Sequence, residues 1–331
     1  MSQALRESIN NVEIIGTLKK FEAEEKVSKA GKDFITGKAT IEVIEDSRIN
    51  NIQVRFFSNK LKNNGELNGI YKGYKTVKDE YQVGDKVRVS GDLRLEEYYT
   101  QSGSLTSFNS VNGLFFNRIE EGSDFRPKAI ATLDMVIESI TPEVDAEGIP
   151  TDLHSVEAFT VGYNSRIIPL RNLVISEMLA DQFSSMYYPG TTGKITLKIN
   201  NYVDTETIEI EQEATGFGST ERVEHEATNF TNNLEIIGGD MPYSDGANEY
   251  SPEDIEQARK IRALALQELK QNSQASATPT GFGGTGSVVE KDNPEQHKKN
   301  LESAMNAKMG NPPFEADAGS VTVTADDIPD F

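Results

Sequence analysis

The chain has no cysteine and no tryptophan, and it has only three histidines among its 331 residues. Without cysteine, disulfide bridges and thiolate metal sites are excluded, which fits a reducing compartment. His154, His225 and His297 stand far apart in the sequence, so a zinc site is not indicated. The sequence therefore predicts neither a disulfide framework nor a metal centre, and it indicates no cofactor.

Long apolar runs are also missing. The first ten residues are polar and lack the apolar core of a signal peptide, and no stretch reaches the length of a transmembrane helix. Hydrophobic residues make up 36% of the chain, which is low for a fully packed globule of this length. We therefore expect a soluble, cytoplasmic protein with no membrane partner and with one part of its chain disordered.

The net charge of −20 is distributed unevenly along the chain. Residues 1–120 hold 18 Lys and Arg against 17 Asp and Glu, a net charge of +1. Residues 121–331 hold 15 against 36, a net charge of −21. Because a local basic face rather than the total charge governs contact with phosphates, the amino-terminal third is the part suited to a polyanion.

Residues 10–119 alternate between apolar and polar side chains with a period of two, which predicts half-buried strands. The polar stretch 60–82 is expected to form a long loop or a short helix between the third and fourth strands. This order matches the five-stranded OB-fold barrel, although other small barrels share the alternation. The strands are predicted over residues 12–19, 37–44, 52–57, 86–98 and 106–119.

The rest of the chain is expected to contain less regular structure. After domain 1–120 and a linker over 121–128, residues 129–240 read as a second β-rich domain, compatible with a diverged OB barrel. Ser251, Pro252 and Asp254 form the start signal of a helix over 251–270, whose apolar stripe packs on the second domain or binds a partner. Residues 271–331 are expected to form a disordered, acidic tail. The fold class is thus mainly all-β.

Rings and cations alternate on the predicted outer side of the amino-terminal strands. Arg55 and Phe57 point outward on the third strand, unless the phase is shifted by one residue, which would bury Phe57. This mixture suits a single-stranded nucleic acid, because rings stack on bases and cations contact phosphates. The candidate binding residues are Lys19, Lys38, Arg55, Phe57, Lys60, Tyr71, Lys72, Tyr74, Lys75, Arg88, Arg94 and Tyr98.

Three segments, residues 10–18, 54–61 and 84–103, resemble the bacterial and bacteriophage single-stranded DNA-binding protein family. The resemblance covers about the first third of the chain and implies an OB fold. It also implies that Phe57 and Tyr98 stack on bases. Asn51 stands at a third such position, where many members of the family have a tryptophan.

The end of the chain is a further and independent point of resemblance. An acidic tip with an aromatic ring beside the terminal carboxylate suits an apolar pocket rimmed by basic residues, although many acidic termini are simply frayed. The family usually ends in Ile-Pro-Phe, whereas Asp330 is inserted here. The resemblance implies that this tip recruits replication and recombination proteins. The tip consists of Asp326, Asp327, Ile328, Pro329, Asp330 and Phe331.

No catalytic constellation is evident in the sequence. Residues 281–286 match G-x-G-x-x-G but lie in low-complexity sequence without a flanking strand and helix, so dinucleotide binding is not indicated. We expect a non-enzymatic protein that coats single-stranded DNA without sequence preference during replication, recombination or repair in a bacterial or phage-infected cell. It could also form a homo-oligomer. The alternatives are a protein-binding or viral assembly module, a nuclease, and RNA as the bound strand.

Overall fold

The computed structural model describes most of the chain up to residue 276. The described ranges are 4–45, 48–100, 102–120, 122–145, 148–212, 221–244 and 246–276. The predicted acidic tip lies outside the described residues, as does all of the predicted tail beyond residue 276. Residues 271–276, predicted to be disordered, instead continue the last helix.

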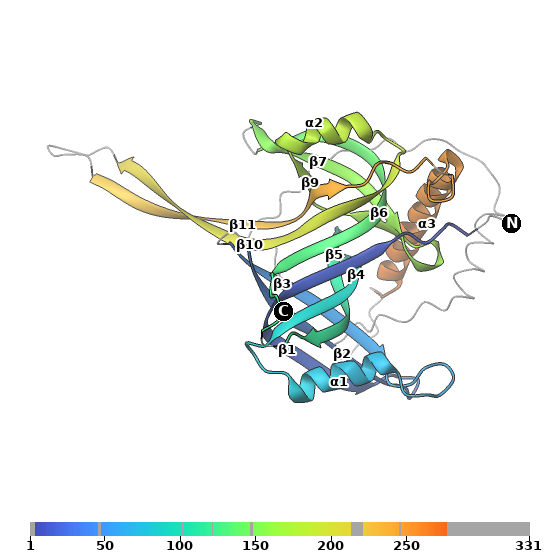
Figure 1. Cartoon of the computed structure of the whole chain (residues 1–331). Coiled ribbons are helices and arrows are strands. Elements are labelled where there is room, and N and C mark those ends of the chain that lie inside the picture. Colours follow the sequence, from blue (N-terminus) through green and yellow to red (C-terminus); the bar gives the residue numbers. More distant parts are fainter. Residues whose placement is uncertain are drawn as a thin grey trace. The chain divides into compact units, whose positions relative to one another are not determined.

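The amino-terminal strands close into an OB-fold barrel, as predicted (Figure 1). The hydrogen-bonded ring runs β1-β2-β3-β5-β4 and back to β1, and only the contact between β3 and β5 is parallel. We call this unit barrel 1. Its elements are β1 (Asn10–Val27), β2 (Asp33–Glu45), β3 (Arg48–Asn59), α1 (Gly69–Glu80), β4 (Lys86–Tyr99) and β5 (Leu105–Arg118).

The period-two pattern gives the correct faces of these strands. Ile14, Ile41, Val54 and Val89 are fully buried, each from a different strand. The stretch 60–82, predicted as a loop or short helix, contains α1, whose first turn is capped by the Asn68 side chain accepting the Ile70 amide at 3.0 Å. The apolar side of α1 packs against the barrel, and the polar side of the helix faces outward.

The following strands close into a second barrel with the same connections. The ring runs β6-β7-β9-β11-β10 and back to β6, its parallel contact again joins the third and fifth members, and a helix again precedes the fourth. The region 129–240 is therefore a second OB-type barrel, which we call barrel 2. Its elements are β6 (Lys128–Val144), β7 (Pro150–Val161), β8 (Ile167–Leu170), which pairs only with β7, β9 (Leu173–Ser176), α2 (Glu177–Met186), β10 (Thr192–Gln212) and β11 (Glu221–Gly239).

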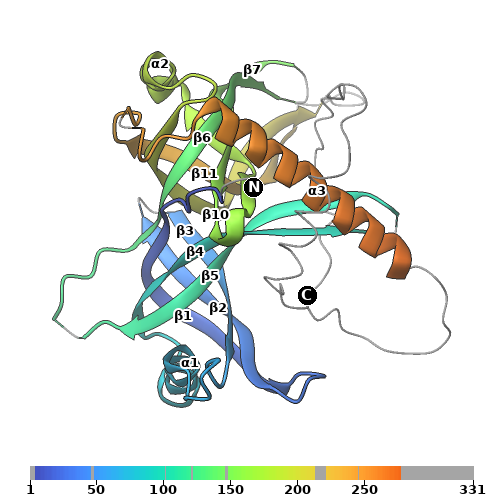
Figure 2. The ribbon, with the colours of Figure 1, turned by 90° about the vertical axis from the view of Figure 1, so that its right-hand side faces the viewer.

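The two barrels share one sheet. Residues 10–15 of β1 pair with residues 128–133 of β6 in antiparallel register, which joins all eleven strands of the described chain (Figures 1 and 2). The expected linker is thus only a short connection that ends at Lys128. Since the first strand of each barrel is the one that pairs, the two units meet at equivalent places.

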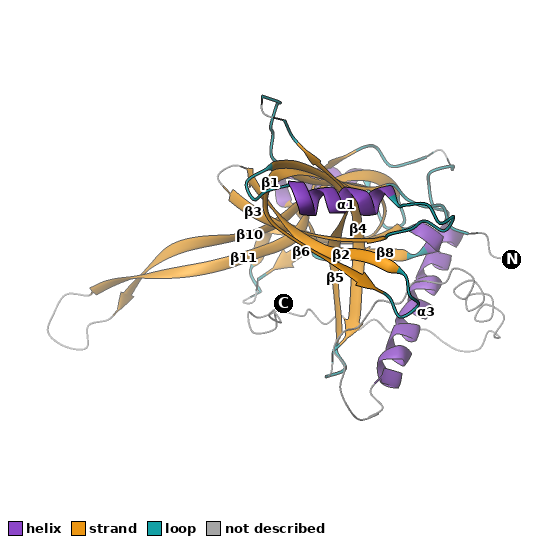
Figure 3. Ribbon diagram, turned by 90° about the horizontal axis from the view of Figure 1, so that it is seen from below, coloured by secondary structure: helices purple, strands orange, loops and turns teal. Residues whose placement is uncertain are grey.

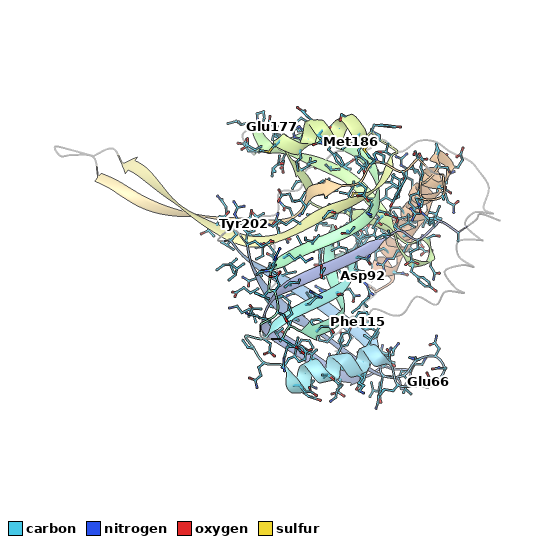
Figure 4. The ribbon with its side chains drawn as sticks, in the orientation of Figure 1. Glu66, Asp92, Phe115, Glu177, Met186 and Tyr202 are labelled. Carbon is cyan, nitrogen blue, oxygen red and sulfur yellow. The ribbon has the colours of Figure 1, made fainter. Side chains whose placement is uncertain are left out.

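The β10–β11 hairpin extends beyond barrel 2 as a two-stranded arm (Figures 1 and 3). Only residues 192–198 of β10 pair with β6, while β10 and β11 stay paired from Ile195 and Gly239 to Gln212 and Glu221. Tyr202 lies at the root of this arm (Figure 4).

The carboxy-terminal helix α3 (Pro252–Ser276) packs against the barrels, which supports the first of its two interpretations. Its start signal works as predicted: the Asp254 amide donates to Ser251 Oγ at 3.1 Å, and the Ser251 amide donates to an Asp254 carboxylate oxygen at 3.1 Å. Ile255, Ala258 and Ile261 on its apolar stripe are buried. No helix of the described residues is long and apolar enough to cross a membrane.

Candidate nucleic-acid interface

The phase of β3 puts a ring outside barrel 1. Phe56 is 2% exposed and belongs to the core, whereas Phe57 is 45% exposed, so the alternative phase is wrong. The Phe57 ring lies 5.3 Å from the ring of Phe34 on β2, measured between centroids. Phe34 was not among the predicted residues, although its alternation with buried Ile35 could have revealed it. Two rings thus lie together at this edge of the barrel.

A second ring group lies on the same side of the sheet. The Arg55 guanidinium carbon is 5.7 Å from the ring centroid of Phe108 on β5. Phe108 pairs with Glu96, and Tyr98, which is 41% exposed, pairs with Thr106 two residues along the same hairpin. Residues two apart on a strand share a face, so Phe108 and Tyr98 are diagonal neighbours on the open side of the β4–β5 hairpin.

We call this surface the outer face of barrel 1. It crosses from β2 over β3 and β5 to β4, and it alternates rings with cations in the way that a single strand requires. Its rings and cations are Phe34, Lys38, Arg55, Phe57, Lys60, Phe108, Arg94 and Tyr98.

Lys19 and Arg88 are not part of this set. Lys19 lies on β1 against Glu42, and Arg88 lies toward the other end of β4, where it pairs with Asn117 and Ile15 and contacts Glu13. Asn51, which stands at the tryptophan position of the resembling family, is exposed on β3, and its carbonyl accepts from Asn201 of barrel 2 at 3.0 Å.

The structure contradicts two of the candidate binding residues, Tyr71 and Tyr74, because both rings are buried. Tyr74 is 1% exposed, and its hydroxyl donates to the Gly113 carbonyl at 2.7 Å; its burial raises its pKa. Tyr71 is 7% exposed, and its hydroxyl donates to Glu25 at 2.8 Å. Tyr71, Tyr74 and Val77 recur at helical spacing and face the barrel, so these rings are core rather than binding side chains.

The lysines of α1 belong to a different surface from the outer face. Lys75 donates to Glu25 at 3.1 Å, as does Lys78 from the next turn. The hydrogen bonds that Glu25 accepts from Tyr71, Lys75 and Lys78 lower its pKa to about 2. Lys72 is exposed on the outside of the same helix. The helix therefore closes one end of the barrel instead of adding to the interface.

Most of the predicted cations contact a carboxylate. These pairs are at least partly exposed, so each contributes at most about 1 kcal/mol and exchanges readily for another anion. The positive charge of the outer face is consequently close to balanced by neighbouring carboxylates until another anion, such as a phosphate, replaces them. The pairs and their N–O distances are Lys38–Glu22 at 3.8 Å, Arg55–Glu96 at 4.0 Å, Lys60–Asp33 at 2.8 Å, Arg88–Glu13 at 3.4 Å, Arg94–Asp92 at 3.1 Å, Lys19–Glu42 at 2.9 Å and Lys75–Glu25 at 3.1 Å.

The inner side of the β4–β5 hairpin is fixed by barrel 2 and α3. Glu97, whose side chain is 9% exposed, accepts two hydrogen bonds from Arg262 and one from Ser107 at 2.7 Å. Asn109 donates to the Pro169 carbonyl at 3.0 Å and accepts from the Arg171 amide at 2.6 Å. The hairpin that carries Phe108 and Tyr98 is thus held in place by residues far along the chain, which sequence reasoning did not find.

The fold and this surface define a protein of two OB-type barrels, one of which has an aromatic and cationic outer face. The chain belongs to the YorF family, whose sequence model matches residues 8–272. A search of curated proteins finds no match.

Three solved structures are similar to the chain at low identity. A deletion mutant of the single-stranded DNA-binding protein from Thermus aquaticus has a TM-score of 0.44 at 14% identity, covering 75% of this chain and 98% of that one. The wild-type protein gives 0.42 at 13%, with 75% and 99% covered. A Plasmodium falciparum SSB complex with single-stranded DNA gives 0.26 at 11%, with 35% and 99% covered. Scores of this size carry no functional argument for this chain.

Proposed function

We propose that the protein binds single-stranded DNA without sequence preference on the outer face of barrel 1, and that it is not an enzyme. The observation that supports this most directly is the gathering of exposed or half-buried rings and arginines on one side of an OB barrel. Phe57 beside Phe34, and Phe108 beneath Arg55, offer two stacking places with cations between them. Every base has a flat face, so such a surface tolerates any sequence.

The expected energetics fit a binder of moderate strength. Stacking on an aromatic side chain contributes roughly 1–3 kcal/mol per base. The arginines and lysines exchange a carboxylate for a phosphate, so the gain from each is small, and affinity falls as salt rises. The lack of a ring at Asn51 removes a further stacking place.

The wider role that we propose rests on the sequence. The protein would coat single strands in replication, recombination or repair within a bacterial or phage-infected cell, and Asp326–Phe331 would recruit proteins of these processes. The acidic tail that carries these residues would also cover the outer face when DNA is absent, because its carboxylates mimic phosphate. Deleting Asp326–Phe331 should abolish capture of partners while DNA affinity stays equal or rises; a large loss of DNA affinity would contradict this role.

The central test is a titration of a fluorescent oligo-dT and an equally long duplex at two salt concentrations. We expect the single strand to bind more tightly, with an affinity that falls with salt. Phe57→Ala with Tyr98→Ala should weaken oligo-dT binding by tenfold or more at roughly 1–3 kcal/mol per ring. Tyr188→Ala is the matched control, since this ring is 66% exposed but belongs to barrel 2, just after α2. Equal affinity of the wild type and the double variant would remove the site.

A protein-binding or assembly module is the second candidate, and the ion pairs favour it. The predicted cations of the outer face contact carboxylates, and the whole chain has a net charge of −20. Absence of any salt-dependent binding to oligo-dT would favour this module over the DNA-binding protein. Degradation of the labelled strand on addition of divalent metal would instead reveal a nuclease.

A further inference from the structure

Asn112 lies at the centre of the outer face, between its two arginines. On β5 it follows the core residue Val111, so its side chain is on the outer side of the sheet. It pairs with Arg55 on β3 and with Asp92 on β4. Asp92, which holds Arg94 at 3.1 Å, is marked on β4 in Figure 4.

The Asn112 amide nitrogen has no hydrogen-bond partner among the described residues, although the residue is only 5% exposed. Buried amide groups are nearly always paired, because removing them from water without a new hydrogen bond costs free energy. Its neighbours are engaged elsewhere: Arg55 contacts Glu96 and the Phe108 ring, and Arg94 contacts Asp92. The outer face therefore contains an unused donor in the middle of its row of cations.

We propose that Asn112 is a base-reading residue whose amide donates to a carbonyl oxygen of a nucleobase. This inference rests on the proposed function and adds a preference to it. Thymine, uracil, cytosine and guanine all carry a carbonyl oxygen, and adenine carries none. The protein thus binds any single strand but holds carbonyl-bearing bases more tightly than adenine at this one position.

The geometry indicates where a base would stack and how the Asn112 amide would become accessible to it. Phe57 lies two residues beyond Arg55 on β3, so it is a diagonal neighbour of Asn112, and a base stacked on its ring presents an edge toward the amide. Arg55 and Arg94 flank the amide, and the carboxylates that they contact are partly exposed. When phosphates take over these guanidinium groups, the side chains move outward and uncover Asn112.

The test compares a thymine strand with one in which the central thymines are replaced by difluorotoluene, which keeps the shape of the base and lacks its carbonyl acceptors. The wild type should prefer thymine by about tenfold, the worth of one hydrogen bond. Asn112→Ala should bring this ratio close to one, and it should lower the preference for oligo-dT over oligo-dA. Asn117→Ala, an exposed amide further along β5, should keep the wild-type ratio.

The outcomes separate this inference from the proposed function. If the wild type binds single strands and Asn112→Ala keeps the full ratio, the inference is overturned and the proposed function stands. If the wild type binds no single strand at low salt, both are overturned. Should Asn112→Ala fold poorly in thermal unfolding, Asn112→Asp keeps the shape of the side chain and removes the donor, and a ratio close to one is again expected.

Discussion

Barrel 1 and barrel 2 have the same ring of strands but different outer chemistry. In barrel 1, the outward positions of the third, fifth and fourth strands carry Arg55, Asn112 and Arg94. The corresponding positions in barrel 2 carry Val174, Glu235 and Asn200; Lys198 stands directly opposite Glu235 on β10, and Asn200 donates to Glu235 at 2.9 Å. The same backbone therefore presents one surface suited to a polyanion and another that satisfies its own polar groups.

This difference teaches that the barrel itself does not define the binding site. Three of the described basic residues of barrel 2 show how its cations are engaged with neighbours: Lys194 contacts Asp240, Lys198 contacts Glu45, and Arg171 contacts Glu97. Two of these three contacts reach into barrel 1. Barrel 2 thus uses its cations to hold its neighbour, and function depends on the side chains placed on a common scaffold.

The strongest test of the comparison concerns the helix that closes each barrel. Tyr74 of α1 donates to the Gly113 carbonyl on β5, and Tyr187 after α2 donates to the Asp240 carbonyl just beyond β11, both at 2.7 Å. Replacing either residue by Ala should cost about 3–5 kcal/mol, because a buried aromatic ring is lost. Urea unfolding should show one shared transition for both variants, since the sheet is continuous. Two separate transitions would show that the barrels unfold independently.

A smaller effect is expected where the hairpin of barrel 1 meets α3. Arg262→Ala should cost about 2 kcal/mol, because Glu97 stays buried with only Ser107 and Arg171 as partners. Arg259→Ala is the control on the same helix, since its pair with Glu138 is exposed and should be worth less than about 1 kcal/mol. Equal losses from the two variants would mean that this contact does not fix the hairpin.

The same contact predicts a dependence of stability on pH. Burial would raise the pKa of Glu97, but the hydrogen bonds from Arg262 and Ser107 outweigh it and lower the pKa below its usual 4.5. A lowered pKa stabilises the folded state at pH values above 4.5, and this contribution is lost as the pH falls through the folded-state value. The free energy of unfolding of Glu97→Gln, measured with urea, should therefore fall less than that of the wild type between neutral and acidic pH. An unchanged pH profile would remove Glu97 as a source of acid sensitivity.

The smallest effect concerns the acids of the two outer faces. Glu96→Gln should release Arg55 and tighten oligo-dT binding by about twofold to fivefold, in keeping with a pair worth less than about 1 kcal/mol. Glu235→Gln in barrel 2 should leave this affinity unchanged, because the Glu235 carboxylate accepts from the Asn200 amide, and the neighbouring Lys198 contacts Glu45 instead. If both variants tighten binding equally, the affinity for oligo-dT depends on the total charge of the protein, and binding does not distinguish barrel 1 from barrel 2.

Much of the fold could be predicted from the sequence where the pattern is local. The strand alternation gave the burial of Phe56 and the exposure of Phe57 correctly, and the signal at Ser251 and Asp254 placed the start of α3. The burial of Tyr71 and Tyr74 is a local signal too, because their spacing with Val77 is that of one face of a helix. Phe108 was missed because no phase was assigned to its strand.

Other features could not be predicted because they join distant parts of the chain. The pairing of β1 with β6 is made by backbone groups, which carry no side-chain signature. The contact between Glu97 and Arg262 joins residues separated by 165 positions. The unpaired amide of Asn112 is recognisable only when its neighbours on β3 and β4 are known.

The sequence by itself determined the strands, their inner and outer faces, the last helix and the concentration of cations in the first third of the chain. These follow from periodicity and composition, which act over a few residues. Only the tertiary structure decided that two barrels share one sheet, which rings gather on the outer face, and which cations are already held by acids. These depend on contacts between segments far apart in the chain, whose partners are chosen by packing and hydrogen bonding in three dimensions rather than by local pattern.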